Sequence, residues 1–74
     1  MTAQPAPPRY EFSFTRRRYG HLTFTWVHVL SPTSGKWLLL GDPYLAVTPA
    51  AKTLHADAQS VLNDEAQGLP VVYA

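Results

Sequence analysis

The chain has 74 residues, of which 46% are hydrophobic and 12% aromatic, and its formal net charge is +1 at pH 7. A chain of this length forms at most one domain and buries a modest part of its surface. Because it has no cysteine, neither disulfides nor thiolate-bound metals can supplement the core. The start of the chain lacks the pattern of a signal peptide, and no apolar run approaches the roughly 18–20 residues that cross a bilayer. We therefore expect a cytoplasmic protein that makes no membrane contact.

The first residues differ from the rest of the chain. Residues 1–8, MTAQPAPP, hold three of the seven prolines and no large apolar side chain apart from Met1. Proline cannot donate a hydrogen bond to a strand ladder, and nothing else in this segment can anchor a core. We expect a disordered tail over residues 1–8 and one small α+β domain over residues 9–74.

Two segments, residues 9–15 and 21–30, alternate between apolar and polar side chains. Period two predicts half-buried strands, and Gly20 can take the positive φ of a connecting turn. The spacing predicts an antiparallel hairpin with residues 16–20 at its tip and the aromatic rows of both strands on one face. Those rows are Tyr10, Phe12 and Phe14 in the first strand and Leu22, Phe24, Trp26 and His28 in the second.

The second half of the chain predicts a further strand and a helix. Residues 31–35 have the composition of a turn, and the following run KWLLLG, residues 36–41, predicts a strand that is apolar on both faces. Thr48 as N-cap and Pro49 at the first helical position predict a helix over residues 49–67, which Gly68 ends. One helical stripe is apolar; it contains Ala51, Leu54, Ala58, Val61 and Leu62.

These elements predict an α+β fold: a three- or four-stranded antiparallel sheet in the order β-β-β-α, with residues 69–74 as an optional short C-terminal strand, and one helix packed on the aromatic face. The helical stripe would then cover Phe12, Phe14, Phe24 and Trp26. Val27 and Val29 would lie on the second face with apolar side chains of the third strand. Soluble monomers seldom expose such a patch, so we expect a homodimer, a partner or the C-terminal tail to cover it.

No arrangement of residues predicts catalysis. His21 and His28 fall on opposite faces of a strand, and His55 has no second histidine at the helical spacing of zinc ligands. The adjacent Asp64 and Glu65 are typical of a solvated helix end. We therefore predict no catalytic residue, no metal site and no cofactor.

The basic residues gather at one end of the chain. Residues 1–36 carry five basic residues and one acidic residue, whereas residues 37–74 carry one basic and four acidic residues. Arg16, Arg17 and Arg18 either grip phosphates from a hairpin tip or keep a solvated hairpin end from aggregating. An isoelectric point of about 8.2 lies below the values near 9 that are typical of duplex-binding domains. Exposed aromatic rows could also stack on bases, but with so few other apolar residues we expect these rings in the core.

Three antiparallel strands followed by a helix resemble the DNA-binding domain at the amino terminus of tyrosine integrases and the domain of plant ethylene-response factors. The likeness covers residues 19–62 and includes PTSGKW, residues 32–37, and TPAAKTLHADA, residues 48–58. It implies a sheet that enters a DNA groove. In those domains the groove-facing side of the sheet carries basic groups, whereas the strand pattern here predicts Thr23, Thr25, Val27 and Val29 on that side.

The sequence thus predicts a non-catalytic binding protein that occupies the surface of a macromolecular partner, most simply a protein. Its size is similar to that of phage and plasmid inhibitors such as anti-CRISPR proteins. The alternative is a DNA-binding sheet module of the integrase type, with nucleic acid contacted through the arginines of the hairpin tip. The predicted partner-binding residues are Arg16, Arg17, Arg18, Tyr19, Val27, Val29 and Trp37.

Overall fold

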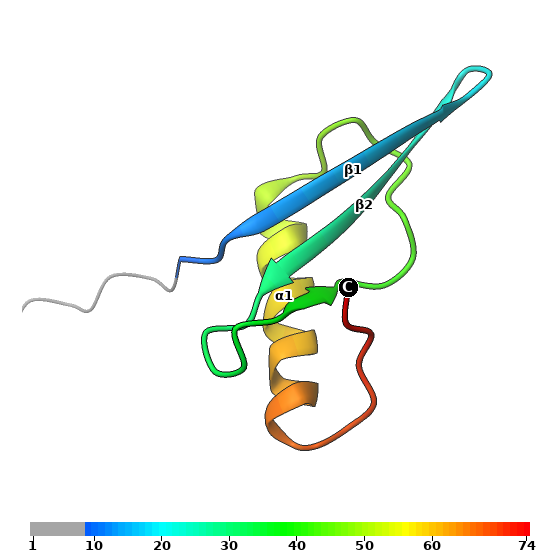
Figure 1. The fold of residues 1–74 in the computed structure, drawn as a ribbon. Helices are drawn as coiled ribbons and strands as arrows, with labels where there is room; N and C mark the ends of the chain where they lie inside the picture. Colours follow the sequence, from blue (N-terminus) through cyan, green and yellow to red (C-terminus); the bar gives the residue numbers. More distant parts are fainter. Residues whose placement is uncertain (1–8) are drawn as a thin grey trace, which may run out of the picture.

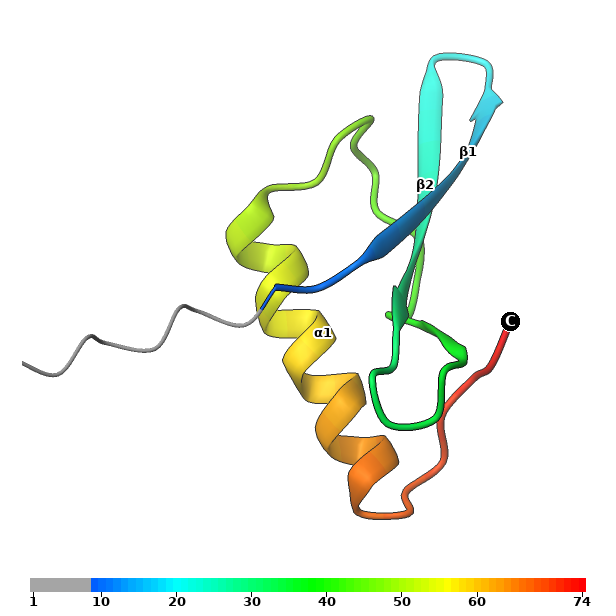
Figure 2. The same ribbon diagram turned by 60° about the vertical axis from the view of Figure 1, so that its left-hand side comes forward.

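The structure, a computed structural model, describes residues 9–74, so the tail predicted over residues 1–8 lies outside the described residues. Its elements are β1 (Phe12–Tyr19), β2 (Leu22–Leu30), β3 (Trp37–Leu39) and α1 (Ala51–Ala66). The strands form one antiparallel sheet in the order β1-β2-β3, and α1 lies against one face of it (Figures 1 and 2). The predicted α+β fold is confirmed.

The hairpin of β1 and β2 has a tighter turn than the sequence predicts. Pairing runs from Phe12 opposite Val29 to Tyr19 opposite Leu22, so that only Gly20 and His21 connect the strands. Gly20 has a φ of +60°, as the first central residue of a type II′ turn requires. The arginines predicted at the tip are therefore part of β1. The hairpin extends past the N-terminal end of α1 (Figure 1).

The register of this hairpin decides which side chains face the helix. Because the turn has two residues, each even-numbered residue of β1 lies opposite an odd-numbered residue of β2, as Phe14 lies opposite Val27. Directly paired residues project from the same face of a sheet. The aromatic rows of the two strands therefore lie on opposite faces, and the prediction that Phe24 and Trp26 join the core beneath the helix is wrong.

The core forms between α1 and the face that carries the valines. Val29, Leu38 and Ala58 are fully buried at its centre. Val27 is also buried, at 1% exposure, so the expectation that Val27 and Val29 lie on the second face is wrong as well. The side chains packed around this centre include Tyr10, Phe12, Leu40, Val61, Leu62 and Val71.

The helix confirms most of its predicted stripe but begins later than expected. Leu54 and Ala58 are buried, whereas Ala51 is exposed. The N-cap is Ala50, which makes no side-chain capping bond, so the predicted start at Thr48 and Pro49 is wrong by two residues.

The predicted helix end is confirmed. The Gly68 N–H donates to the Glu65 carbonyl (3.1 Å), and the Leu69 N–H donates to the Asp64 carbonyl (2.9 Å). With Gly68 at a φ of +74°, these bonds form a Schellman motif.

The C-terminal tail runs along the outer edge of β3. The Leu39 N–H donates to the Val72 carbonyl (2.9 Å), and the Ala74 N–H donates to the Trp37 carbonyl (3.0 Å). Tyr73 forms an isolated bridge with Leu38, so the fourth strand is only tentative. The tail thus extends the sheet at its edge and does not fold back over the second face.

Candidate binding surface

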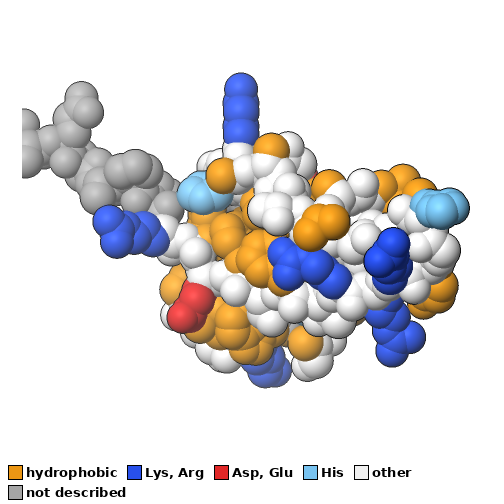
Figure 3. All heavy atoms as spheres, turned by 90° about the horizontal axis from the view of Figure 1, so that it is seen from above, with side chains coloured by type: hydrophobic (Ala, Val, Ile, Leu, Met, Phe, Trp, Pro, Cys, Tyr) orange, Lys and Arg blue, Asp and Glu red, His pale blue; other side chains and the backbone are white. Residues whose placement is uncertain are grey.

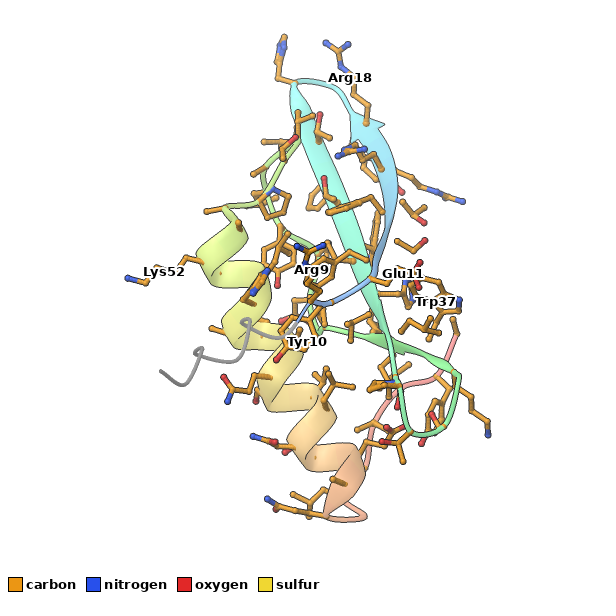
Figure 4. The ribbon with its side chains drawn as sticks, turned by 90° about the vertical axis from the view of Figure 1, so that its left-hand side faces the viewer. Arg9, Tyr10, Glu11, Arg18, Trp37 and Lys52 are labelled. Atoms are coloured by element: carbon orange, nitrogen blue, oxygen red, sulfur yellow. The ribbon has the colours of Figure 1, made fainter. Side chains whose placement is uncertain are left out.

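The face of the sheet opposite α1 carries aromatic and aliphatic side chains from all three strands. The pairings of Tyr19 with Leu22 and of Leu39 with His28 place these residues on the same side as Phe24. In Figure 4, Trp37 points away from α1, whereas Tyr10 lies between the helix and the sheet. We call this surface the open face; its residues are Tyr19, Leu22, Phe24, Trp26, Trp37 and Leu39.

Neighbouring rings contact one another along the open face. The Tyr19 and Phe24 ring centroids are 5.4 Å apart at an interplanar angle of 74°, and those of Phe24 and Trp26 are 6.2 Å apart at 35°. Tyr19 is 54% exposed and Leu22 is 53% exposed. Phe24, Trp26 and Trp37 are half-buried, in part because adjacent rings cover them.

The three arginines of β1 divide between the two faces. Arg17 lies directly opposite Phe24 and so belongs to the side of the open face, whereas Arg16 and Arg18 project from the other side. Arg16 donates from Nε to the Val47 carbonyl (2.6 Å), and Arg18 donates from Nε to the Gly20 carbonyl (3.2 Å). All three side chains are exposed.

The loop before α1 pairs with the edge of β2 that faces away from β1 and contacts the buried side chain of Thr25. Thr25 and Tyr44 exchange both backbone hydrogen bonds (2.9 Å each), and the fully buried Thr25 hydroxyl donates to the Ala46 carbonyl (2.6 Å). The Tyr44 hydroxyl donates in turn to the Asp57 carboxylate on α1. Burial, together with this bond, raises the pKa of the Tyr44 hydroxyl. These contacts position the strand that carries Phe24 and Trp26 relative to the helix.

A second polar cluster fixes the opposite end of the domain. The Glu65 carboxylate accepts hydrogen bonds from the hydroxyls of Ser31 (2.5 Å), Ser34 (2.9 Å) and Tyr73 (3.1 Å). The Ser31 bond is the main cause of a lowered pKa of Glu65, with smaller contributions from Ser34, Tyr73 and the nearby Lys36. We call this group the Glu65 cluster; it connects α1 to the β2–β3 turn and to the tail.

The histidines lie apart from one another. His21 is in the hairpin turn, His28 pairs with Leu39, and His55 packs edge-on against Tyr10 at 5.2 Å between ring centroids. Within residues 9–74, no three side chains of His, Asp or Glu gather where they could hold a metal ion. The same residues enclose no pocket and include no helix long and apolar enough to cross a membrane.

Charge separates along the molecule. Arg16, Arg17 and Arg18 lie on the hairpin, whereas Asp57, Asp64 and Glu65 lie on α1. Figure 3, which looks down on the hairpin end, shows basic side chains standing around patches of hydrophobic ones. The open face therefore lies beside the basic end of the molecule.

Neither protein-family models, nor curated proteins, nor solved structures give a match to this chain. The likeness to the integrase domain is therefore an expectation from the sequence that no comparison supports.

The predicted site residues fall into three groups. Arg17, Tyr19 and Trp37 belong to the open face, Arg16 and Arg18 flank it from the other side of β1, and the valines are buried. Sequence reasoning missed Phe24 and Trp26 as surface residues. A two-residue turn at Gly20 and His21 is the signal that would have placed them there.

Proposed function

We propose that this protein is a non-catalytic binding module that occupies a macromolecular partner with its open face. The observation that carries the proposal is the row of Tyr19, Phe24 and Trp26 on the side of the sheet away from the core. Contiguous apolar surface on a small soluble domain marks an interaction site. Tyrosine, tryptophan and arginine are also the residues that contribute most at binding hot spots, and Arg17 stands within this row.

The surface suits the mode of action of a small inhibitor. A sheet face supported by a helix behind it can cover a partner's site without a conformational change, because the aromatic side chains are already in place. This is how we envisage a phage- or plasmid-type modulator of the predicted kind. The position of Arg17 favours a second candidate, the integrase-type module, since that module also presents a basic group on the sheet face away from its helix.

Site-specific cross-linking tests the proposed surface. A photoreactive benzoylphenylalanine replaces Phe24 in one variant and Leu69 in a control; Leu69 is 48% exposed and lies beyond the end of α1. In cells or lysate, we expect Phe24→benzoylphenylalanine to form a discrete cross-linked product that the Leu69 variant does not form. Equal labelling from both positions, or none from Phe24, contradicts a partner on the open face.

A further inference from the structure

We infer that the partner of the open face is a single-stranded nucleic acid, with bases stacked on Tyr19, Phe24 and Trp26 and a phosphate held by Arg17. The inference rests on the proposed function, since it assigns a class of partner to the same surface. RNA and single-stranded DNA share the required chemistry, and the experiment below distinguishes them.

The aromatic rings of the open face are suited to stacking with bases. Tyr19, Phe24 and Trp26 form one row, with successive centroids 5.4 and 6.2 Å apart. Every base has a π face, so a row of aromatic side chains on an antiparallel sheet accepts unpaired bases with little regard to sequence. A terminal ring that is 54% exposed, Tyr19, gives an incoming base access to this row.

The charge beside these rings is suited to binding a phosphate. Arg17 lies directly opposite Phe24, so its guanidinium extends from the same face as the stacking row. Arg16 and Arg18 project from the other side of β1 and donate from Nε to backbone carbonyls, so Arg17 is the arginine of β1 that faces the row. Its guanidinium can bind a phosphate through two nitrogens at once. The acidic residues of α1 lie on the far side of the sheet, as the bonds of Asp57 and Glu65 show. The potential over the row is therefore suited to a polyanion.

A duplex fits this surface less well. Its base faces are already stacked within the helix, so that rings standing on a sheet can reach only base edges or backbone. Reading those edges requires donors and acceptors at defined positions, which a row of Tyr, Phe and Trp rings supplies poorly.

A second copy of this chain also fits less well. Stacking two open faces would remove the Arg17 side chains from water among aromatic rings, which is unfavourable unless a carboxylate reaches each one. Glu11 points to the same side of the sheet as Trp37 (Figure 4) but precedes β1, at the other end of that strand from Arg17, so a face-to-face pair could satisfy Arg17 only in one antiparallel alignment. A nucleic-acid strand satisfies the rings and Arg17 together.

Fluorescence anisotropy with labelled oligonucleotides tests the inference on the full chain. The probes are a 15-nucleotide oligo(dT), the matching oligo(U) and a blunt 15-base-pair DNA duplex, each at low and at moderate salt. We expect the single strands to bind more tightly than the duplex. A preference between oligo(dT) and oligo(U) identifies the natural strand as DNA or RNA. Tryptophan fluorescence should decrease on binding, because Trp26 lies in the stacking row.

Matched variants separate stacking from general charge attraction. Phe24→Ala should weaken single-strand binding by about fivefold or more, given the usual contribution of one base–aromatic stack. Arg17→Ala should weaken binding and reduce the salt dependence by about one phosphate contact. Lys52→Ala removes the same charge from an exposed position on α1 that points away from the sheet (Figure 4), and it should leave both quantities unchanged. Melting curves confirm that each variant is folded.

Three outcomes overturn the inference. Equal affinity for the duplex, with equal losses from Arg17→Ala and Lys52→Ala, would indicate unspecific attraction to polyanions. A dimer in light scattering that Phe24→Ala dissociates would assign the surface to a second copy. Absence of oligonucleotide binding while Phe24 still cross-links to a protein would refute the nucleic-acid partner and keep the proposed function. If neither oligonucleotide binding nor cross-linking from position 24 is observed, the nucleic-acid partner and the proposed binding function are both refuted.

Discussion

Glu65 is the residue on which most of the long-range polar contacts at one end of the domain converge. Its carboxylate accepts bonds from three hydroxyls, which belong to the β2–β3 turn and to the C-terminal tail. Ser31 itself is 1% exposed, and a buried hydroxyl needs a partner. The cluster therefore joins segments that have few apolar contacts of their own.

We predict that the stability of the protein decreases in acid partly through Glu65. The pKa of Glu65 is lowered in the folded state, chiefly by the Ser31 bond. Its contribution is complete above the unfolded-state pKa of about 4.3 and is lost as the pH falls through the lower folded-state pKa. Melting temperatures of the wild type and of Glu65→Gln, measured between pH 7 and pH 3, should converge as the pH decreases. A constant difference across this range would mean that Glu65 contributes no charge-dependent stability.

At the scale of elements, the length of one turn determines the chemistry of a whole face. With residues 16–20 as the connection, the aromatic rows of both strands would share one face; with Gly20 and His21 as the connection, they are separated. A slip of one residue moves every side chain of a strand to the other face. The strands, the helix stripe and the Gly68 cap were predictable, because each has a local signal in period or in residue type.

Other features had no such signal. The side of the sheet occupied by Phe24 and Trp26 depends on pairing between strands, and Arg16 to Tyr19 continue β1 although three consecutive charges resemble a turn. The contact between Ser31 and Glu65 joins residues 34 positions apart. Of the residues predicted for the site, Arg17, Tyr19 and Trp37 lie on the open face, whereas the burial of Val27 and Val29 could not be foreseen without the register.

We predict that Gly20 stabilises the hairpin through its backbone alone. A Cβ at Gly20 meets nothing within 4 Å, yet φ is +60°. Gly20→Ala should therefore lower the free energy of unfolding by about 1–2 kcal/mol. The same position made with D-alanine, which prefers positive φ, should be neutral or stabilising by up to about 1 kcal/mol. Chemical denaturation of both synthetic chains provides the measurement; equal effects of the two enantiomers would exclude the type II′ turn.

We predict that the two apolar faces contribute unequally to stability. Leu38 is fully buried beneath α1, so Leu38→Ala should cost about 2–5 kcal/mol, a large share of the stability of a small domain. Phe24→Ala, on the half-buried open face, should cost less than half as much. Urea denaturation at one temperature compares the two variants. If the Phe24→Ala protein is as unstable as the Leu38→Ala protein, Phe24 is a core residue and the assignment of the faces is wrong.

At the scale of the whole molecule, the two faces of the sheet differ in what they contribute to stability. The apolar residues of α1 and of the inner sheet face stabilise the fold, and the acidic residues of α1 connect the helix to Tyr44 and to the β2–β3 turn. The outer sheet face and the arginines contribute little to these contacts. This separation allows the open face to change by substitution while the fold is retained.

The edges of the sheet determine how copies of this chain can add to one another. In the described part of the chain, β1 has no strand on its outer side, and its charged residues discourage pairing there. At the other edge, the bonds from Leu39 and Ala74 engage the tail with β3. The tail therefore occupies backbone donors and acceptors of β3 that would otherwise be open to a strand of another copy.

Removal of the tail should expose the outer backbone groups of β3 to pairing with other copies. In a chain truncated after Gly68, the short apolar β3 becomes a bare edge strand, and each copy that pairs with it presents a further edge. We expect its concentrated solutions to scatter light and to develop thioflavin fluorescence over hours, whereas the full chain stays clear. A truncated chain that remains monomeric and clear would show that the tail is not what protects this edge of the sheet.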